Sequence, residues 1–284
     1  MRVAITGSTG LIGTALMTKL QAAGHEVVPL ARSGKGPSWG ADGPDLAGCE
    51  AVIHLAGENI GGRRWTQRQR RRIVESRTVG TGIIAQAAAD AGCRVMLSMS
   101  ASGFYGDRDE PAAESAEPGT GFLAEVCQAW EAAAEPARTA GVRVIHPRMA
   151  VVLSRKGGAL HKMWLPFRLG LGGPIAGGRQ WLPWITLDDA AAALVHLLES
   201  DVQGPVNVAA GAARNRDFVK ALGRAMHRPA FMPLPGFAMW LLFGRMGMET
   251  VVQGQAMQTD KLRASGFEVR HADLDAALAG VVAR

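Results

Sequence analysis

The chain has 284 residues, of which 48% are hydrophobic and 20% are charged. This length and apolar content suit one folded unit with a large core, and they exclude a globally disordered chain. The net charge of +6 raises the question of a nucleic-acid partner, but the basic residues lack interleaved aromatics and known nucleic-acid motifs, so we expect none.

Neither end of the sequence carries a membrane signal. The first residues lack a long apolar region and a small-residue cleavage site, and the run 237–243 is far shorter than the roughly 20 residues that span a bilayer. The three cysteines, Cys49, Cys93 and Cys127, have neither an even count nor metal-ligand spacing. We therefore expect a cytoplasmic protein with buried, reduced thiols, no metal site and no membrane partner.

Short β-rich runs alternate with longer Ala-rich amphipathic segments along the first half of the chain. Strands are expected over 3–6, 26–31, 51–55, 94–99 and 142–146, and helices over 11–23, 67–91 and 121–139. Such alternation is typical of parallel strands joined by crossover helices. The sequence predicts an α/β fold, an NAD(P)-binding Rossmann fold with a doubly wound parallel sheet.

The pattern changes after residue 152. Residues 154–183 are dense in Gly, Pro and Trp, which predicts loops that cover a site. A helix over 188–199, a strand over 205–208 and helices over 216–226 and 237–246 are expected after it. We divide the chain into a Rossmann core (1–153), substrate-side loops (154–185), a helix returning to the core (186–203) and a smaller mixed C-terminal lobe on the substrate side (204–284).

The glycine run Gly7, Gly10 and Gly13 lies directly between the first strand and the first helix. The first glycine permits a tight turn, the second lets the backbone approach a pyrophosphate, and the third allows close packing of the helix on the strand. The phosphates would then lie at a helix N-terminus, where N–H groups and the helix dipole favour negative charge. This context predicts a dinucleotide site.

The end of the second strand indicates which nicotinamide cofactor is bound. A carboxylate there would bind the ribose 2′-hydroxyl of NAD, whereas an arginine accommodates a 2′-phosphate. Arg32 occupies this position and favours NADP over NAD. The alternative is that Arg32 is an exposed loop residue.

Several further runs carry a resemblance to a known family. They are His54-Leu55-Ala56-Gly57, Ser98 to Gly106, Pro147-Arg148, Pro166 to Ile175 and Pro183-Trp184-Ile185. With the glycine run, they resemble the extended short-chain dehydrogenase/reductases and the NAD-dependent epimerase/dehydratase group. More narrowly, nearly the whole chain is similar to the atypical YfcH-like epimerase family proteins, which end in a C-terminal domain of unknown function (DUF1731).

The resemblance implies a set of cofactor-binding residues. Gly7, Gly10, Leu11, Ile12 and Gly13 would hold the pyrophosphate. Arg32 would meet the 2′-phosphate, and the adenosine side of the cofactor would lie over Leu55, Ala56 and Gly57. Arg77 matches a cofactor-contacting arginine of the family, with a solvated helix charge as the alternative. Asp188 and Asp189 match acids at a helix start, and capping of that helix is the favoured role.

The resemblance also implies a Ser-Tyr-x-x-x-Lys set for proton transfer, and here the chain departs from it. Ser100 lies where the serine belongs, but Phe122 and Val126 stand at the tyrosine and lysine positions, and neither side chain transfers a proton. Tyr105, the one tyrosine of the chain, is the leading acid candidate because it follows a strand end. The alternative is a buried aromatic whose hydroxyl finds a hydrogen-bond partner.

Further residues are weaker candidates for proton transfer or substrate binding. Ser102 and Glu58 are secondary candidates for proton transfer, although a loop carboxylate such as Glu58 is usually solvated. The candidates for substrate binding are Glu58, Trp181 and Trp184. The two tryptophans are close in sequence to Trp164, Arg168 and Arg179, and their alternative is a hydrophobic core of the lobe.

Two functions follow from these observations. The first is an NADP-dependent oxidoreductase or epimerase acting on a small polar, nucleotide-sugar-like substrate, and the second is a non-catalytic protein that binds NADP and reports cofactor state to a partner. The sequence leaves open whether the chain forms a homodimer.

Overall fold

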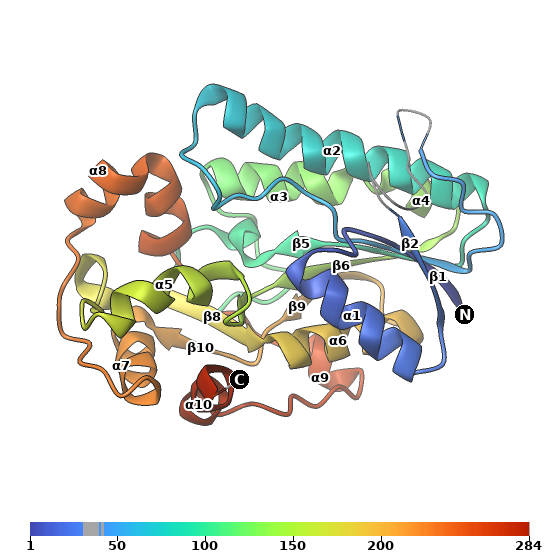
Figure 1. Ribbon diagram of the computed structural model, residues 1–284. Coiled ribbons are helices and arrows are strands. Elements are labelled where there is room, and N and C mark those ends of the chain that lie inside the picture. The colour runs from blue at the N-terminus through green and yellow to red at the C-terminus, as the bar shows by residue number, and fades with distance from the viewer. Residues whose placement is uncertain (31–39, 41–42, 284) are drawn as a thin grey trace.

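The computed structural model describes residues 1–30, 40 and 43–283, and a parallel sheet forms its centre (Figure 1). The strands follow the order β2-β1-β3-β4-β6-β5, and β9 also pairs with β6. Every pairing in this sheet is parallel. The strands are β1 (Arg2–Thr6), β2 (Glu26–Leu30), β3 (Ala51–His54), β4 (Val95–Ser98), β5 (Ser100–Ala101), β6 (Arg143–Met149) and β9 (Gly204–Val208).

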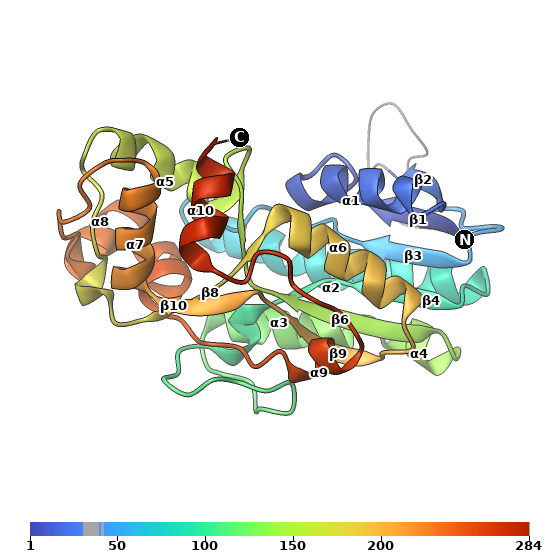
Figure 2. The same cartoon turned by 90° about the horizontal axis from the view of Figure 1, so that it is seen from below.

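Helices cover both faces of this sheet. On one face lie α2 (Gln67–Asp90), α3 (Phe122–Ala132) and α4 (Glu135–Thr139), and on the other lie α1 (Leu11–Ala22) and α6 (Leu187–Glu199), as Figures 1 and 2 show. Every residue of the central strands β3 and β4 is buried, because both faces of a parallel sheet are covered by its crossover helices. The predicted doubly wound Rossmann fold is confirmed.

A smaller lobe is built on a second sheet of mixed direction. In it β8 (Trp181–Thr186) lies between β7 (Val151–Leu153), which is parallel to it, and β10 (Gly211–Arg214), which is antiparallel. The helices of this part are α5 (Gly158–Arg168), α7 (Asn215–Ala225), α8 (Gly236–Gly247) and α10 (Leu274–Ala283), with a short π-helix, η3, over Met248–Val252. The short helix α9 (Asp260–Ala264) instead packs against β9 of the central sheet, where Lys261 donates to the Pro205 carbonyl oxygen at 2.7 Å. The expected smaller mixed lobe is therefore present.

Three details differ from the expected elements. The segment 154–185, expected as loops, contains α5 and β8, because Leu160 and Phe167 bury one face of a helix despite the Gly and Pro around them. The strand β9 belongs to the central sheet and not to the lobe. The single helix expected over 121–139 is two helices, and Pro136, which has no N–H to donate, lies in the first turn of the second.

Within the described residues, no helix combines the length and the apolar character needed to cross a membrane.

Candidate functional site

The turn from β1 to α1 is shaped by glycine. Gly7 has a φ of 68°, in the left-handed region that glycine adopts without strain, and its carbonyl accepts a hydrogen bond of 3.0 Å from the Gly10 N–H. Gly10 then caps α1 with no side-chain hydrogen bond to the first turn. The backbone N–H groups at the start of α1, which include those of Leu11 and Ile12, therefore remain suited to an anionic group.

The same glycines let three pieces of backbone lie in contact. A Cβ on Gly7 would lie 2.9 Å from the nitrogen of Ala56, and a Cβ on Gly13 would lie 2.2 Å from the carbonyl oxygen of Gly7. Both contacts are too short for a larger residue. The turn, the start of α1 and the chain after β3 thus form one close-packed cradle, and its shape and uncapped helix fit the pyrophosphate of a dinucleotide.

Arg77 lies under the loop that follows β3. Its Nη1 donates to the carbonyl oxygen of Glu58 at 3.1 Å, its guanidinium lies over the ring of Trp130 at 4.8 Å, and a Cβ on Gly57 would be 3.5 Å from its Cζ. Burial lowers the pKa of Arg77 from its ordinary value. Arg77 therefore fixes the backbone of the Gly57–Glu58 turn and is not the solvated helix charge considered as an alternative.

Both the backbone and the side chain of Glu58 form hydrogen bonds with residues of α2. Its N–H donates to Ser76 Oγ at 3.0 Å, and its Oε1 accepts a hydrogen bond of 2.9 Å from Gln69 Nε2. The side chain is half-buried, so this carboxylate is held in place beside the predicted cofactor cradle and is not a freely solvated loop charge.

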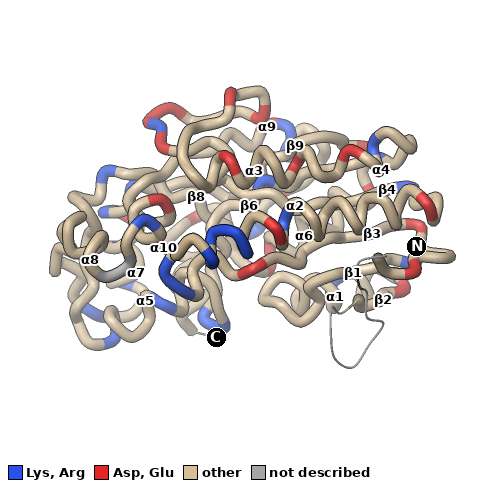
Figure 3. Tube along the Cα trace, turned by 90° about the horizontal axis from the view of Figure 1, so that it is seen from above, with Lys and Arg blue, Asp and Glu red and all other residues tan. Residues whose placement is uncertain are grey.

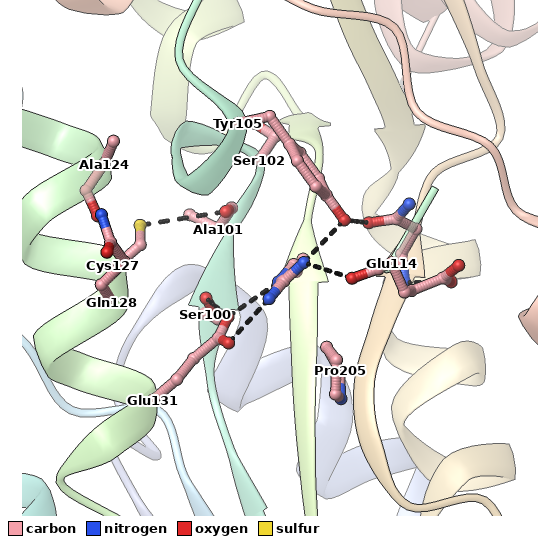
Figure 4. Close-up of polar contacts among 12 residues, drawn as sticks. Ser100, Ala101, Ser102, Tyr105, Glu114, Ala124, Cys127, Gln128, Glu131 and Pro205 are labelled. Carbon is pink, nitrogen blue, oxygen red and sulfur yellow. Dashed lines mark hydrogen bonds and ion pairs between the residues drawn. The ribbon is translucent and has the colours of Figure 1, made fainter. Parts of the chain in front are cut away.

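The hydroxyl groups of Ser100 and Tyr105 point into the protein (Figure 4). Ser100 Oγ donates to Glu131 Oε1 at 2.6 Å, and Tyr105 OH donates to Asn207 Oδ1 at 2.6 Å while accepting from Arg148 Nη1 at 2.9 Å. Tyr105 is 0% exposed, and burial raises its pKa, an effect that the hydrogen bond from Arg148 partly offsets. This geometry matches the structural alternative stated for Tyr105, a buried aromatic with a partnered hydroxyl.

A buried ion pair organises these hydroxyl groups. Arg148 on β6 binds Glu131 on α3 through two hydrogen bonds, Nε to Oε1 at 2.8 Å and Nη2 to Oε2 at 2.9 Å (Figure 4). The guanidinium also lies over the ring of Phe104 at 3.4 Å and donates to the Glu114 carbonyl oxygen at 3.1 Å. The pair joins the sheet, α3 and the segment after β4, so its role is to hold these elements together.

We expect Tyr105→Phe to lower the free energy of unfolding by about 1–3 kcal/mol, because Arg148 and Asn207 would each lose a buried hydrogen-bond partner. Denaturant unfolding followed by circular dichroism measures the loss. The affinity for NADPH, measured on the same sample, is expected to stay unchanged. A variant as stable as the parent chain would refute the structural role.

The face of α3 that meets the segment after β4 carries Leu123 and Cys127. A Cβ on Gly103 would lie 3.3 Å from Leu123 Cβ and 3.8 Å from Cys127 Sγ. Burial raises the pKa of the Cys127 thiol to about 12, so the thiolate does not form near neutral pH. Leu123 carries no ionisable group, so neither of these two residues replaces the tyrosine and lysine that are missing at Phe122 and Val126.

Phe122 and Val126 instead pack toward α2. The ring of Phe122 lies edge-on to Trp65 with centroids 5.0 Å apart, and the Arg70 guanidinium lies 4.3 Å from its centroid. Together with Ile73, Phe122 and Val126 form a separate buried cluster. The apolar residues at the tyrosine and lysine positions therefore serve the packing of α3 on α2.

The two tryptophans chosen as substrate contacts have different surroundings. Trp184 is 2% exposed and belongs to the core, packed beside Gly211, which fits the alternative reading as lobe core. Trp181 is half-buried, donates from Nε1 to the Asp109 carbonyl oxygen at 2.8 Å, and carries the Arg214 guanidinium over its ring at 3.9 Å. Trp181 therefore joins β8 to the segment after β4.

The acids at the start of α6 are structural. Lys19 on α1 binds Asp188 at 2.8 Å, and the buried Asp189 accepts hydrogen bonds from the Thr186 hydroxyl, the Arg270 N–H and the His271 Nδ1. Ligand atoms of Asp188, Asp189 and His271 lie within 4.8 Å of one another, but a cation would have to displace these donors. The expected capping role is wrong, because Thr186 is the N-cap of α6 and its Oγ1 accepts a hydrogen bond from the Asp189 N–H at 3.1 Å. The two acids lie in the first turn, and the cluster ties the C-terminal segment to α6.

Sequence reasoning missed the ion pair between Glu131 and Arg148 and the role of Asn207. In the sequence, Pro147-Arg148 stands out only as part of a family pattern. The signal for its role was the arginine itself, since a charge inside a strand buried on both faces requires a partner. Arg32 lies outside the described residues, so its contact with a 2′-phosphate stays a prediction.

Comparison with known proteins shows the family to which the chain belongs. The model of the NAD dependent epimerase/dehydratase family matches residues 3–209, and that of a domain of unknown function (DUF1731) matches residues 234–281. The human epimerase family protein SDR39U1 is 39% identical over 299 residues, covering 100% of both chains. The epimerase family protein Mb2239 of Mycobacterium bovis is 38% identical, covering 97% of this chain and 96% of its own.

Solved structures agree with these matches. The crystal structure of human SDR39U1 (isoform 2) with NADPH superposes with a TM-score of 0.91 at 34% identity, covering 100% of both chains. A nucleoside-diphosphate sugar epimerase from Corynebacterium glutamicum has a TM-score of 0.82 at 33% identity, covering 99% of this chain and 58% of that one.

Proposed function

Because the chain belongs to the NAD-dependent epimerase/dehydratase family, we propose that it binds NADPH and acts as an oxidoreductase or epimerase on a small polar substrate. The observation that carries the proposal is the glycine cradle at the uncapped N-terminus of α1, which suits a dinucleotide pyrophosphate. The structure of SDR39U1 with NADPH, a relative matched over its whole length, supports the choice of cofactor.

In this proposal each part of the cradle has a separate task. Gly7, Gly10 and Gly13 admit the pyrophosphate, and the first-turn N–H groups of α1 bind its oxygens. The chain from Leu55 to Gly57 lies along the adenosine side, and Arg77 keeps that loop in position. When bound, NADPH would supply a hydride in a reduction, whereas in an epimerisation the oxidised form, NADP, would take a hydride from the substrate and return it.

The substrate would lie beside Glu58, at the edge formed by the carboxyl ends of the parallel strands. Glu58 is the proton-exchanging residue that we propose, because its carboxylate is half-buried and is oriented by Gln69, whereas the hydroxyls of Ser100 and Tyr105 are used inside the protein. The description of the Corynebacterium relative as a nucleoside-diphosphate sugar epimerase supports a nucleotide-sugar-like substrate.

One observation favours a second function, a protein that binds NADPH without chemistry and reports cofactor state to a partner. On the face of α3 next to the segment after β4, Leu123 is apolar, the Cys127 thiol stays protonated near neutral pH, and Glu131 is held in the ion pair with Arg148. A screen of nucleotide sugars and small carbonyl compounds distinguishes the two functions. Hydride exchange that Glu58→Gln reduces supports the enzyme, and tight cofactor binding without any exchange supports the reporter.

We expect Arg32→Ala to weaken NADPH binding by at least about tenfold and to leave NADH binding unchanged, because a guanidinium bound to a phosphate contributes about 1.5–3 kcal/mol. Titration calorimetry with both reduced cofactors measures the two affinities. Arg94→Ala, an exposed arginine at the start of β4, is the matched control. Equal losses for NADPH and NADH would refute the assigned role of Arg32.

A further inference from the structure

Acidic residues are absent from three stretches of the sequence that meet in the fold. Residues 59–74, 154–187 and 218–248 contain fifteen of the 31 Lys and Arg residues and none of the 25 Asp and Glu residues. Arg64 Nη2 donates to the Leu241 carbonyl oxygen at 3.2 Å, Lys162 donates to the Gly61 carbonyl oxygen, and Arg228 Nε donates to the Arg168 carbonyl oxygen at 3.1 Å. The three stretches thus join at one end of the molecule, where α5, α8 and the start of α2 lie (Figure 1).

The exposed apolar side chains gather on the same stretches. Among the described residues, nine large hydrophobic side chains are exposed, and only Val79 lies elsewhere. The other eight are Leu165, Leu169, Leu171, Phe231, Met232, Phe237, Trp240 and Leu241. We call these eight residues, with Arg168, Arg228 and Arg245 beside them, the basic apolar end. Figure 3 shows the blue of Lys and Arg recurring along α5 and near α7 and α8.

The helix α8 turns its apolar side outward. Phe237, Trp240 and Leu241 are 75%, 59% and 65% exposed, and their spacing of three and four residues places them on one face of the helix. Met239, on another face, is only 3% exposed. A soluble helix normally buries its apolar stripe, so this reversed arrangement indicates a surface that another body covers.

The positive charge of the basic apolar end indicates which kind of partner covers the exposed face of α8. A second copy of the chain, bound face to face about a two-fold axis, would place the Lys and Arg residues of these stretches against the same residues of its partner, and the stretches themselves contain no acid. A nucleic acid would meet the cations but would leave the exposed leucines and phenylalanines in water. An anionic lipid surface fits both the cations and the exposed apolar side chains. Its headgroups attract Lys and Arg, and its acyl boundary accommodates Trp, Phe and Leu.

We propose that the basic apolar end binds the surface of an anionic membrane, with the exposed face of α8 at the acyl boundary and the surrounding arginines at the headgroups. The expectation of no membrane partner rested on the absence of a run long enough to span a bilayer. Binding at the surface needs no such run, since an interfacial helix lies in the plane of the membrane. The proposal does not depend on the reaction proposed above.

Vesicle flotation with the full chain tests the proposal. We expect binding to vesicles of phosphatidylcholine with about 30 mol% phosphatidylglycerol, little binding to pure phosphatidylcholine, and loss of binding at high salt. Trp240→Ser is expected to weaken binding by at least about tenfold, since a buried aromatic side chain is lost from the interface. Arg228→Gln is expected to weaken it by about fivefold.

Two matched control variants show whether a loss of vesicle binding is specific to the basic apolar end. Val79→Ser removes an exposed apolar side chain from α2, and Arg94→Gln removes an exposed charge at the start of β4, so neither is expected to change binding. Thermal unfolding and NADPH affinity show that each variant is folded. The proposal is overturned by absence of binding to anionic vesicles at low salt, or by equal losses in Trp240→Ser and Val79→Ser. A dimer that Phe237→Ser dissociates, without vesicle binding, assigns the face to a second copy instead.

Discussion

Gly13→Ala is expected to abolish saturable NADPH binding. The new Cβ would lie 2.2 Å from the carbonyl oxygen of Gly7 and 2.9 Å from the Cα of Ser8, and both of these are backbone atoms that no side-chain rotation can move. The turn would have to open, and the N–H groups at the start of α1 would leave the positions that bind the pyrophosphate. Titration calorimetry is expected to show a loss of at least about a hundredfold, because two or more charge-assisted hydrogen bonds are lost together.

Gly280→Ala is the control for this substitution. Gly280 lies inside α10, and a Cβ there meets no atom within 4 Å. Alanine is the better helix former, so this variant is expected to gain about 0.5–1 kcal/mol of stability and to bind NADPH like the parent chain. Unaltered binding in Gly13→Ala would show that the cofactor does not lie in this cradle.

Glu131→Gln is expected to give the largest loss of stability, about 3–5 kcal/mol, because it leaves the guanidinium of Arg148 buried without a counter-charge. The Arg148 side chain is 4% exposed and that of Glu131 is 13% exposed, so water cannot replace the lost carboxylate. Denaturant unfolding measures the effect. Glu135→Gln, which removes an exposed carboxylate paired with Arg138 three residues away, is expected to change stability little.

The double substitution Glu131→Leu with Arg148→Met removes both charges of the buried ion pair and keeps apolar side chains of similar size in their place. Replacing a buried ion pair by apolar residues of similar size is often neutral, so the double variant is expected to recover most of the stability lost in Glu131→Gln. If the double variant is as unstable as Glu131→Gln, the hydrogen bonds to Tyr105 and Ser100 contribute more than the pairing of charges.

Most of the central fold could be predicted from the sequence because its signals are local. The glycine turn, the cap of α1 and the period of the apolar residues in α2 each involve residues within a few positions of one another. Hydrophobic strands followed by amphipathic helices then leave few topologies open, since parallel crossovers are right-handed. The break between α3 and α4 also had a local signal, the proline at position 136.

The contacts that decide the roles of the site residues are long-range, and the sequence does not display them. Tyr105 meets Asn207 across 102 positions, and Ser100 meets Glu131 across 31. Neighbouring residues of an extended strand point to opposite sides, so a register error of one residue turns a side chain from the cleft to the core. This is why Ser100 could be placed at a strand end but its hydroxyl could not be assigned a direction.

The orientation of α3 also depends on contacts that the sequence does not display. Residues 122 and 126 share one face, and residues 123 and 127 share the next, only 100° away. Which face packs on α2 and which meets the segment after β4 depends on the distant residues Trp65 and Gly103. The segment 154–185 was predicted as loops because Gly and Pro outweigh the few apolar residues that fold α5 against the lobe.

The proposed function depends on a dinucleotide bound at the start of α1, and titration of the purified full chain with NADPH in a calorimeter tests this binding most directly. We predict saturation at one NADPH per chain, with weaker binding of NADH under the same conditions. A titration that shows no saturable heat with NADPH or NADP, at protein concentrations where the chain is folded, would contradict it.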